Sequence, residues 1–307
     1  LRDFGTGSCH DGLGIAMIDL HLHSRYSDGS LTPAQLVERA HLCGVTALSV
    51  TDHDTCDGNR EAAEAGARLG VRVLAGVEFS AQHGEYSLHI LGYGVERETP
   101  ESRALFGRLR QGREDRLARF VARLNDIGIP LSSRDVREEG TDGVVGRLHI
   151  ARALVRRGFT PSVREAFADL IGRGGRAYVE RVRLEPAEAF ALIRAMGGVA
   201  VLAHPGVFER NHPGRLEALL AELAPLGLDG IEAHYSQHTR EQTALYARFA
   251  AERGLLVTGG SDFHRHDTDG PEIGRGNGEL RVPPECLAAL EGAIAGRRGG
   301  GEPCASG

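Results

Sequence analysis

The chain has 307 residues, of which 41% are hydrophobic and 25% charged, and its formal net charge is -6. These values fit a folded protein with one barrel-sized domain, or a domain with an insertion, and argue against a disordered chain. The acidic balance argues against a general nucleic-acid coat, although a local basic groove is compatible with it. The sequence contains no run of about 18 apolar residues, which is the length that would predict a membrane span. The five cysteines form no C-x-x-C pair, which favours reduced thiols in a cytoplasmic protein.

Short apolar runs alternate with helical patterns from residue 17 onward, which is typical of parallel βα units. Predicted strands cover Met17–Leu22, Val45–Val50 and Val71–Val77, with predicted helices over Pro33–Cys43 and Asn59–Leu69. The first helix has readable ends, because Thr32 can cap it, Pro33 suits its first position and Gly44 can terminate it. We expect residues 1–16 to be a disordered or misassigned leader.

An arginine-rich stretch follows the predicted strand Tyr86–Tyr93. Residues 101–176 show a helical pattern with 16 arginines against 10 acidic residues, a net of +6, whereas the rest of the chain carries -12. We interpret this stretch as a helical insertion, or cap. A basic cap over an acidic barrel suits a substrate with more than one phosphate, although arginine-rich helices can also simply present a solvated face.

Strand and helix patterns resume after the insertion, beginning at Ala177–Met196. The remaining elements are Gly198–Ala203, Arg215–Leu226, Asp229–Ala233, Thr239–Arg253 and Leu255–Gly260. About seven strands result, which favours a distorted barrel, with residues 17–100 and 177–297 as its two parts, over an open sheet. Residues 298–307 are glycine-rich and predict a flexible tail.

Almost every predicted strand ends in a residue able to bind a metal ion, at the edge where parallel barrels place their active sites. A lone histidine near a strand is more often an ordinary core or surface residue. His21 and His23, however, are two residues apart and project to the same side of a strand, and Asp262 and His264 repeat this spacing. Glu78 could bridge two cations, or could simply hydrogen-bond a loop.

Seven short motifs carry a family resemblance: DLHLHS at 19–24, SDG at 27–29, TDHD at 51–54, GVE at 76–78, HILGY at 89–93, AHP at 203–205 and GSDFH at 260–264. Together, in this order, they resemble the PHP (polymerase and histidinol phosphatase) family of metal-dependent phosphoesterases. The resemblance covers about residues 17–265 and implies an α/β fold with a distorted seven-stranded barrel holding up to three divalent ions.

The resemblance also implies a set of ligands. His21, His23, Glu78 and Asp262 would hold one ion, Glu78, His89 and His204 a second, and Asp28, His53 and His264 the third. Asp28 stands where other branches of the family have histidine. Asp28, Glu78, Asp262 and His264 are the expected catalytic members of this set, and Asp19, Asp52 and Asp54 could orient ligands or serve as ordinary turn carboxylates.

The substrate is predicted from the insertion. The sequences at 146–154 (GRLHIARAL), 178–179 and 197–205 resemble the branch of the family that contains 3',5'-nucleoside bisphosphate phosphatases and 5'-to-3' exonucleases on short RNA. Arg147 and His149 are the candidates for binding phosphate, with a structural pair at a helix start as the alternative. His234 could protonate the leaving oxygen, or could only pack.

These features predict a cytoplasmic hydrolase that removes phosphate, or 5' mononucleotides, from a nucleotide or short RNA. The expected cofactor is a divalent metal, with Mn²⁺ favoured and Fe²⁺, Zn²⁺ or Co²⁺ compatible with the same ligands. No membrane partner is predicted, and the sequence does not define an oligomeric state. The alternatives are a histidinol phosphatase, against which the large insertion argues, and a non-catalytic nucleotide-binding module, against which the complete ligand set argues.

Overall fold

The computed structural model of the protein describes residues 17–139, 143, 145–181, 183–265 and 270–299. The predicted leader, residues 1–16, and residues 300–307 of the predicted tail lie outside these ranges. The other two residues of that tail, Arg298 and Gly299, belong to the last helix. No helix in the described ranges is long and apolar enough to cross a membrane.

Seven strands form one continuous sheet in chain order. They are β1 (Met17–Leu22), β2 (Val45–Val50), β3 (Arg72–His83), β4 (Tyr86–Tyr93), β5 (Val199–Leu202), β6 (Gly230–Tyr235) and β7 (Leu256–Gly260). Neighbours pair in parallel except around β4, which is antiparallel to both β3 and β5. A bridge between Leu22 and Phe263 brings the two ends of the sheet together. The predicted distorted seven-stranded barrel is therefore confirmed.

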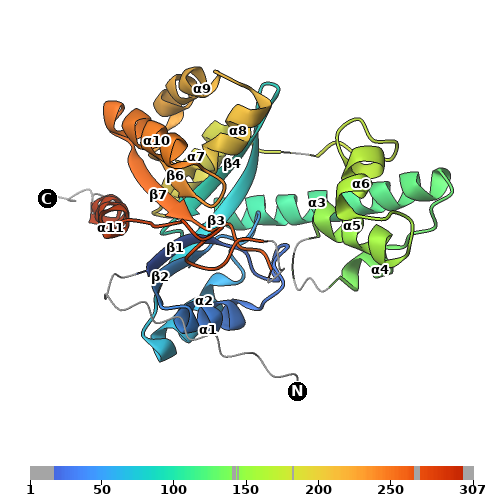
Figure 1. The fold of residues 1–307 in the computed structure, drawn as a ribbon, viewed down its shortest axis with the longest axis horizontal. Coiled ribbons are helices and arrows are strands. Elements are labelled where there is room, and N and C mark those ends of the chain that lie inside the picture. The colour runs from blue at the N-terminus through green and yellow to red at the C-terminus, as the bar shows by residue number, and fades with distance from the viewer. Residues whose placement is uncertain (1–16, 140–142, 144, 182, 266–269, 300–307) are drawn as a thin grey trace, which may run out of the picture.

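Helices cover the outside of this barrel (Figure 1). They are α1 (Pro33–Leu42), α2 (Asn59–Leu69), α7 (Pro186–Ala195), α8 (Pro205–Asn211), α9 (Leu216–Leu223), α10 (Arg240–Glu252) and α11 (Pro284–Gly299). The predicted start of α1 is present. The Thr32 side chain accepts from the Gln35 backbone amide, and the Gln35 side chain accepts from the Thr32 backbone amide.

Four stretches differ from the sequence prediction. Strand β3 continues past Val77 to His83, because it pairs with β4 over eight residues, and Glu78 therefore lies within the strand. No strand forms at the start of Ala177–Met196 in the described residues, where only Leu184 makes an isolated bridge. The short helix α8 and the helix α11 were not predicted, although both begin at a proline.

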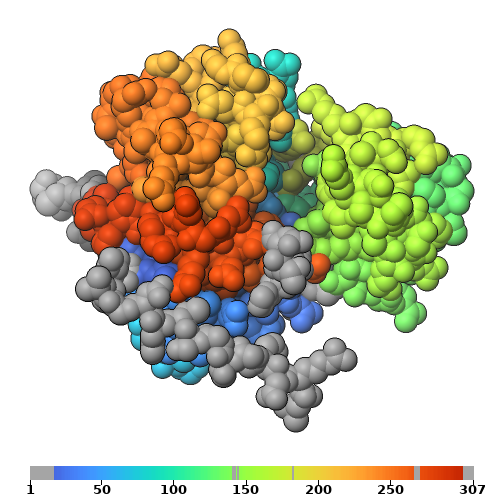
Figure 2. Space-filling model, viewed as in Figure 1, coloured from blue at the N-terminus to red at the C-terminus, as the bar shows by residue number. Residues whose placement is uncertain are grey.

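A second lobe lies between β4 and α7 in the chain and beside the barrel in space (Figures 1 and 2). It contains α3 (Pro100–Asp126), α4 (Ser133–Arg137), α5 (Arg147–Arg156), α6 (Val163–Glu165) and the π-helical turn Ala166–Ile171. Helix α3 joins the two lobes. Its early residues Leu105 and Leu109 pack into the barrel core, while Phe120 and Leu124 pack into a separate core within the second lobe.

The barrel closes where Gly260 of β7 lies against His21 of β1. A β-carbon on Gly260 would stand 2.4 Å from both the backbone nitrogen and the β-carbon of His21. Gly260→Ala should therefore lower the free energy of unfolding by about 1–3 kcal/mol, because the backbones must separate. Thermal unfolding followed by circular dichroism would measure this.

The matched control is Gly112→Ala on α3, where a β-carbon would meet nothing within 4 Å. Replacing this half-buried helical glycine by alanine should stabilise the protein by up to about 1 kcal/mol. Equal unfolding temperatures for the two variants would contradict the close approach at Gly260.

Candidate metal centre

Nine side chains gather at one end of the barrel, around the carboxylate of Glu78. The set comprises His21, His23, Asp28, His53, Glu78, His89, His204, Asp262 and His264, and each member lies within 4 Å of another one. They come from β1, β3, β4 and the loops that follow β1, β2, β5 and β7. The structure thus brings together all nine residues that the sequence predicted as ligands.

The first group is His21, His23 and Asp262. The Nε2 atoms of the two histidines lie 3.3 and 3.1 Å from Oδ1 of Asp262, and 3.5 and 3.2 Å from Oε2 of Glu78. Both imidazoles are fully buried. Because residues two apart on β1 point to the same side, their nitrogens converge on one position between the two carboxylates.

The second group surrounds the other oxygen of Glu78. Its Oε1 atom lies 2.9 Å from Nδ1 of His89 and 3.2 Å from Nε2 of His204. His53 reaches the same carboxylate, with Nδ1 2.9 Å from Oε2. Glu78 is therefore placed to bridge two cations, which is the role the sequence suggested.

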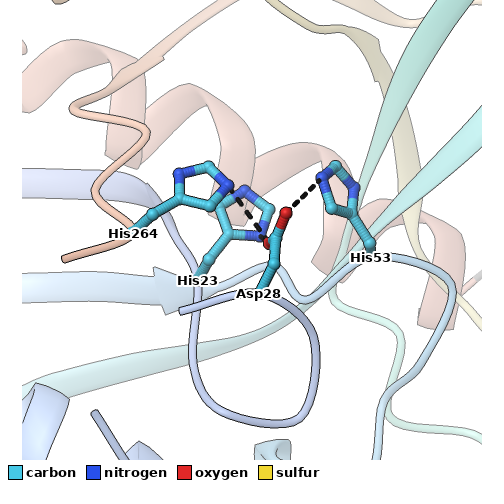
Figure 3. A group of neighbouring side chains, drawn as sticks. All are labelled: His23, Asp28, His53 and His264. Carbon is cyan, nitrogen blue, oxygen red and sulfur yellow. Dashed lines mark ion pairs between the residues drawn. The ribbon is translucent and has the colours of Figure 1, made fainter. Parts of the chain in front are cut away.

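The third group is His23, Asp28, His53 and His264, shown in Figure 3. Nε2 of His264 lies 3.2 Å from Oδ1 of Asp28, and Nε2 of His53 lies 3.9 Å from its Oδ2. The rings of His23 and His264 stack at 4.1 Å between centroids. His53 has one nitrogen toward Glu78 and the other toward Asp28, so it stands between the second and third groups.

The chemistry of this cluster fits divalent metal ions. Six of its buried nitrogen and oxygen atoms make no hydrogen bond: His21 Nε2, His23 Nε2, Asp28 Oδ1, His53 Nδ1, Glu78 Oε2 and His89 Nδ1. Buried polar atoms are nearly always paired, and a convergent set of unpaired imidazole and carboxylate atoms is the donor set that transition metals take. The ions would satisfy these atoms.

The charges of the cluster shift its acid–base behaviour strongly. Burial alone lowers the pKa of His23, but the neighbouring carboxylates of Asp262 and Glu78 outweigh it and raise this pKa to about 10. Burial alone raises the pKa of Glu78, but the charges of His53 and His89 hold it well below its usual range. The cluster thus keeps its carboxylates ionised, as metal ligation requires.

Backbone strain is concentrated at the same place. The non-glycine residues with positive φ in the described ranges are Asp54 (55°), His204 (29°) and Asp262 (58°). Two of them are in the cluster and the third follows His53. Such conformations cost on the order of 1–3 kcal/mol each and persist where the surroundings enforce them. The fold therefore holds these side chains in place at the expense of local backbone stability.

Two residues that the sequence analysis left unassigned support the cluster. Glu232 is fully buried, accepts from Nδ1 of His21 at 2.9 Å and accepts from the His204 amide at 2.7 Å. Its hydrogen bond directs Nε2 of His21 toward the metal position. The Tyr235 hydroxyl donates to Oδ2 of Asp262 at 3.0 Å. The position of Glu232 at a predicted strand end was the only signal for this role.

His234 does not occupy the position that the sequence suggested. A β-bulge between Glu232 and His234 sets both Ala233 and His234 against a single step of β7. This extra residue reverses the alternation of the strand, so Tyr235 rather than His234 shares the side of Glu232. His234 instead lines a cavity of about 550 Å³ with Ser236 and Arg240. The bulge therefore favours the alternative that His234 only packs, and its role as the acid stays a prediction.

The neighbouring aspartates hold loops. Asp19 accepts from the backbone amides of Ser261 and Gly274, at 2.8 and 2.7 Å. Asp52 accepts from the Ser24 amide at 2.8 Å and the Ser27 hydroxyl at 2.6 Å, which fixes the loop leading to Asp28. Neither carboxylate hydrogen-bonds an imidazole of the cluster.

The two predicted phosphate-binding residues lie at the start of α5, in the second lobe. His149 is buried and its Nδ1 accepts from the Gly146 amide at 3.0 Å, so it closes the end of its own helix. Arg147 lies over the ring of Phe167, 5.4 Å from its centre. Neither residue makes a hydrogen bond or ion pair with the nine-residue cluster. The alternative of a structural role at the helix start thus has direct support for His149.

A seven-stranded barrel with a cluster of histidines and carboxylates at one end is typical of metal-dependent hydrolases. Residues 19–173 match the PHP domain family. The chain is 34% identical over 273 residues to the 3',5'-nucleoside bisphosphate phosphatase of Chromobacterium violaceum. The matched residues cover 89% of this chain and 94% of the relative. The chain belongs to the PHP domain family and is a metal-dependent phosphoric ester hydrolase.

Other relatives have related activities. The chain is 36% identical to the 5'-3' exoribonuclease of Haemophilus influenzae, over 80% of this chain and 89% of the relative. It is 35% identical to the phosphoribosyl 1,2-cyclic phosphate 1,2-diphosphodiesterase of Eggerthella lenta, over 86% of this chain and 98% of the relative.

A solved structure agrees with the fold over nearly the whole chain. An amidohydrolase from Chromobacterium violaceum, crystallised with bound sulfate and no metal, superposes with a TM-score of 0.79 at 33% identity. The match covers 91% of this chain and 97% of that protein.

Glu78→Gln tests the bridging role. The amide keeps the shape of the side chain but lacks the charge that faces five imidazoles. We expect fewer bound metal ions per chain by elemental analysis and a loss of phosphoesterase activity on the order of 100-fold or more. Glu222→Gln, at an exposed carboxylate paired with His83, is the control. Unchanged metal content in Glu78→Gln would contradict the assignment.

Glu232→Gln tests the support of His21. This substitution weakens the acceptor at Nδ1 without touching a metal-facing atom, so metal affinity should fall about 10- to 100-fold. Titration of the metal-free protein with Mn²⁺, followed by calorimetry, would measure the change. Affinity equal to that of the unmodified protein would show that Glu232 serves packing alone.

Proposed function

We propose that this enzyme hydrolyses phosphate esters of nucleotides and of short 5'-phosphorylated RNA, with a 3',5'-nucleoside bisphosphate as its smallest substrate. The observation that carries the proposal is a group of five arginines, two of which pair with Asp54, the residue after His53 of the metal centre. This arginine group consists of Arg113 and Arg116 on α3, Arg147 on α5, and Arg181 and Arg183 in the segment that returns to the barrel. A substrate with a second phosphate would contact both the metal centre and the arginine group.

The members of the arginine group are close enough to affect one another. Burial lowers the pKa of Arg116, and the charges of Arg147 and Arg181 lower it further, to about 9. Burial and the charge of Arg113 likewise lower the pKa of Arg181 to about 10, against the opposite effect of Asp54. So much positive charge is costly to bring together, and a bound phosphate dianion would relieve it through paired hydrogen bonds.

His149 is suited to donate a hydrogen bond to phosphate. Its Nδ1 accepts from Gly146, which leaves the proton of the neutral ring on Nε2. Burial lowers the pKa of His149 to about 4, partly opposed by the charge of Asp28. The ring is therefore neutral near pH 7, and its interaction with Asp28 supports a position near the third group of ligands.

Bound divalent ions would supply a nucleophilic water of lowered pKa and would offset charge on the phosphate oxygens. The chain itself would hold these ions through the nine clustered residues, with Glu232 and Tyr235 orienting His21 and Asp262. The arginine group and His149 would bind the part of the substrate that does not react. The mixture of imidazole and carboxylate ligands accepts Mn²⁺, which we favour, and also Fe²⁺, Zn²⁺ and Co²⁺.

The relatives support this choice of substrate, because two of them are named for nucleotide or RNA hydrolysis. The sulfate bound by the Chromobacterium violaceum structure has the shape and charge of phosphate. A second candidate is a ribose cyclic phosphate, since the Eggerthella lenta relative is comparably identical over 98% of its own length. We further propose a cytoplasmic location, because the described cysteines Cys43, Cys56 and Cys286 are free thiols.

The test is a comparison of substrates with the manganese-loaded protein. We expect turnover of adenosine 3',5'-bisphosphate and of a short 5'-phosphorylated RNA, measured by phosphate release and by chromatography of mononucleotides. The variant carrying both His21→Ala and Asp262→Ala should lose activity by a factor on the order of 1,000 or more. Activity surviving in it would contradict metal-dependent hydrolysis at this centre.

Two further substrates separate the alternatives. Release of phosphate from histidinol phosphate, with none from the bisphosphate, would favour a histidinol phosphatase. Opening of a phosphoribosyl 1,2-cyclic phosphate, with no reaction on the bisphosphate or RNA, would favour the second candidate. Nucleotide binding in the presence of manganese without any turnover would indicate a binding module.

A further inference from the structure

One buried carboxylate joins the second lobe to the metal centre. Asp54, in the loop after β2, is 3% exposed. Its Oδ2 accepts from Nε of Arg113 at 3.0 Å, and forms ion pairs with the terminal nitrogens of Arg113 and Arg181. These two arginines come from opposite ends of the second lobe, one from α3 and one from the segment returning to the barrel.

The same residue is tied to the metal-binding side of the barrel. The Asp54 amide donates to the carbonyl of Glu78 at 2.9 Å, and its Oδ1 accepts from the Ser80 amide at 2.9 Å. His53, the residue before it, forms a bridge with Glu78. The loop of residues 52–54 thus runs alongside β3, with His53 facing the ligands and Asp54 facing the second lobe.

The backbone conformation of Asp54 is energetically unfavourable, and the contacts around Asp54 maintain it. Asp54 has a φ of 55°, in the left-handed region that non-glycine residues adopt uncommonly, aspartate and asparagine more often than most. Arg181 makes a further contact with β3, because its Nη1 donates to the Ser80 hydroxyl at 2.7 Å. Arg113 turns its Nη1 toward the start of α5, 3.8 Å from where a side chain on Gly146 would begin. The Asp54 contacts therefore set the direction in which Arg113 and Arg181 present their remaining donors.

We propose that Asp54 is a positioning residue for phosphate recognition. It fixes Arg113 and Arg181 at the edge of the metal centre, so that the arginine group and the metal ligands keep one spacing. A substrate with two phosphates can then bind both at once, with one phosphate at the ions and the other at the arginines. This inference rests on the proposed function, because it assumes that the second phosphate meets the arginine group.

The test compares Asp54→Asn with Asp57→Asn. Asp57 lies in the same loop and pairs with Arg110 of the same helix, at 2.8 Å, but both residues of this pair are exposed. Asp54→Asn keeps an oxygen for the Ser80 amide and loses the charge that holds the arginines. We expect KM for adenosine 3',5'-bisphosphate to rise on the order of 10- to 100-fold in Asp54→Asn, and to stay near the unmodified value in Asp57→Asn.

Two controls distinguish positioning from a general loss of structure. Bound manganese per chain should be unchanged in Asp54→Asn. Its kcat/KM for p-nitrophenyl phosphate, which has no second phosphate, should change less than about threefold. Equal KM values for the two variants would overturn the proposal. So would loss of metal with an equal loss of activity on both substrates.

Hydrogen exchange gives a measure that does not depend on the substrate. Backbone amides of residues 109–117 in α3 should exchange faster in Asp54→Asn than in Asp57→Asn, because the helix loses its buried attachment. Unchanged exchange there would also overturn the proposal. If the unmodified enzyme does not act on the bisphosphate, the proposed function fails, and the exchange measurement still decides whether Asp54 positions α3.

Discussion

The structure depends on one buried carboxylate surrounded by imidazoles. Glu78 is 1% exposed and lies within 3.5 Å of nitrogens from five histidines, most of which have no hydrogen-bond partner there. Burying so many polar atoms is unfavourable unless they are paired with each other or with cations. The barrel provides the rigid frame that forces them together, and metal ions would provide the compensation.

Much of the surrounding structure serves to hold this arrangement. Glu232 orients His21 and reaches the His204 backbone, while Asp52 fixes the loop before Asp28. The strained backbone at His204 and Asp262 directs those side chains inward. A site of this kind cannot adjust easily, which is suited to chemistry that depends on the spacing of fixed charges.

In the proposed function, the second lobe would add specificity to a centre that by itself would accept many phosphate esters. Its own hydrophobic core, including Phe120 and Leu124, makes it a stable unit, and α3 carries it out from the barrel. Its arginines are attached to the barrel loop through Asp54, next to a ligand rather than at a distant surface. The loop of residues 52–54 therefore contacts both the second lobe and the metal centre.

The sequence by itself determined most of the strand and helix alternation and the barrel, because periodicity is a local signal, and its motifs indicated the nine clustered residues through their resemblance to one family. Only the tertiary structure decided that Glu78 lies within a long β3, since pairing with β4 extends the strand past Val77. It also placed Tyr235, and not His234, on the side of the strand that Glu232 occupies, because a bulge visible only in the strand register reverses the alternation. Likewise, the roles of Glu232 and Asp54 arise from contacts between segments far apart in the chain, which no local pattern records.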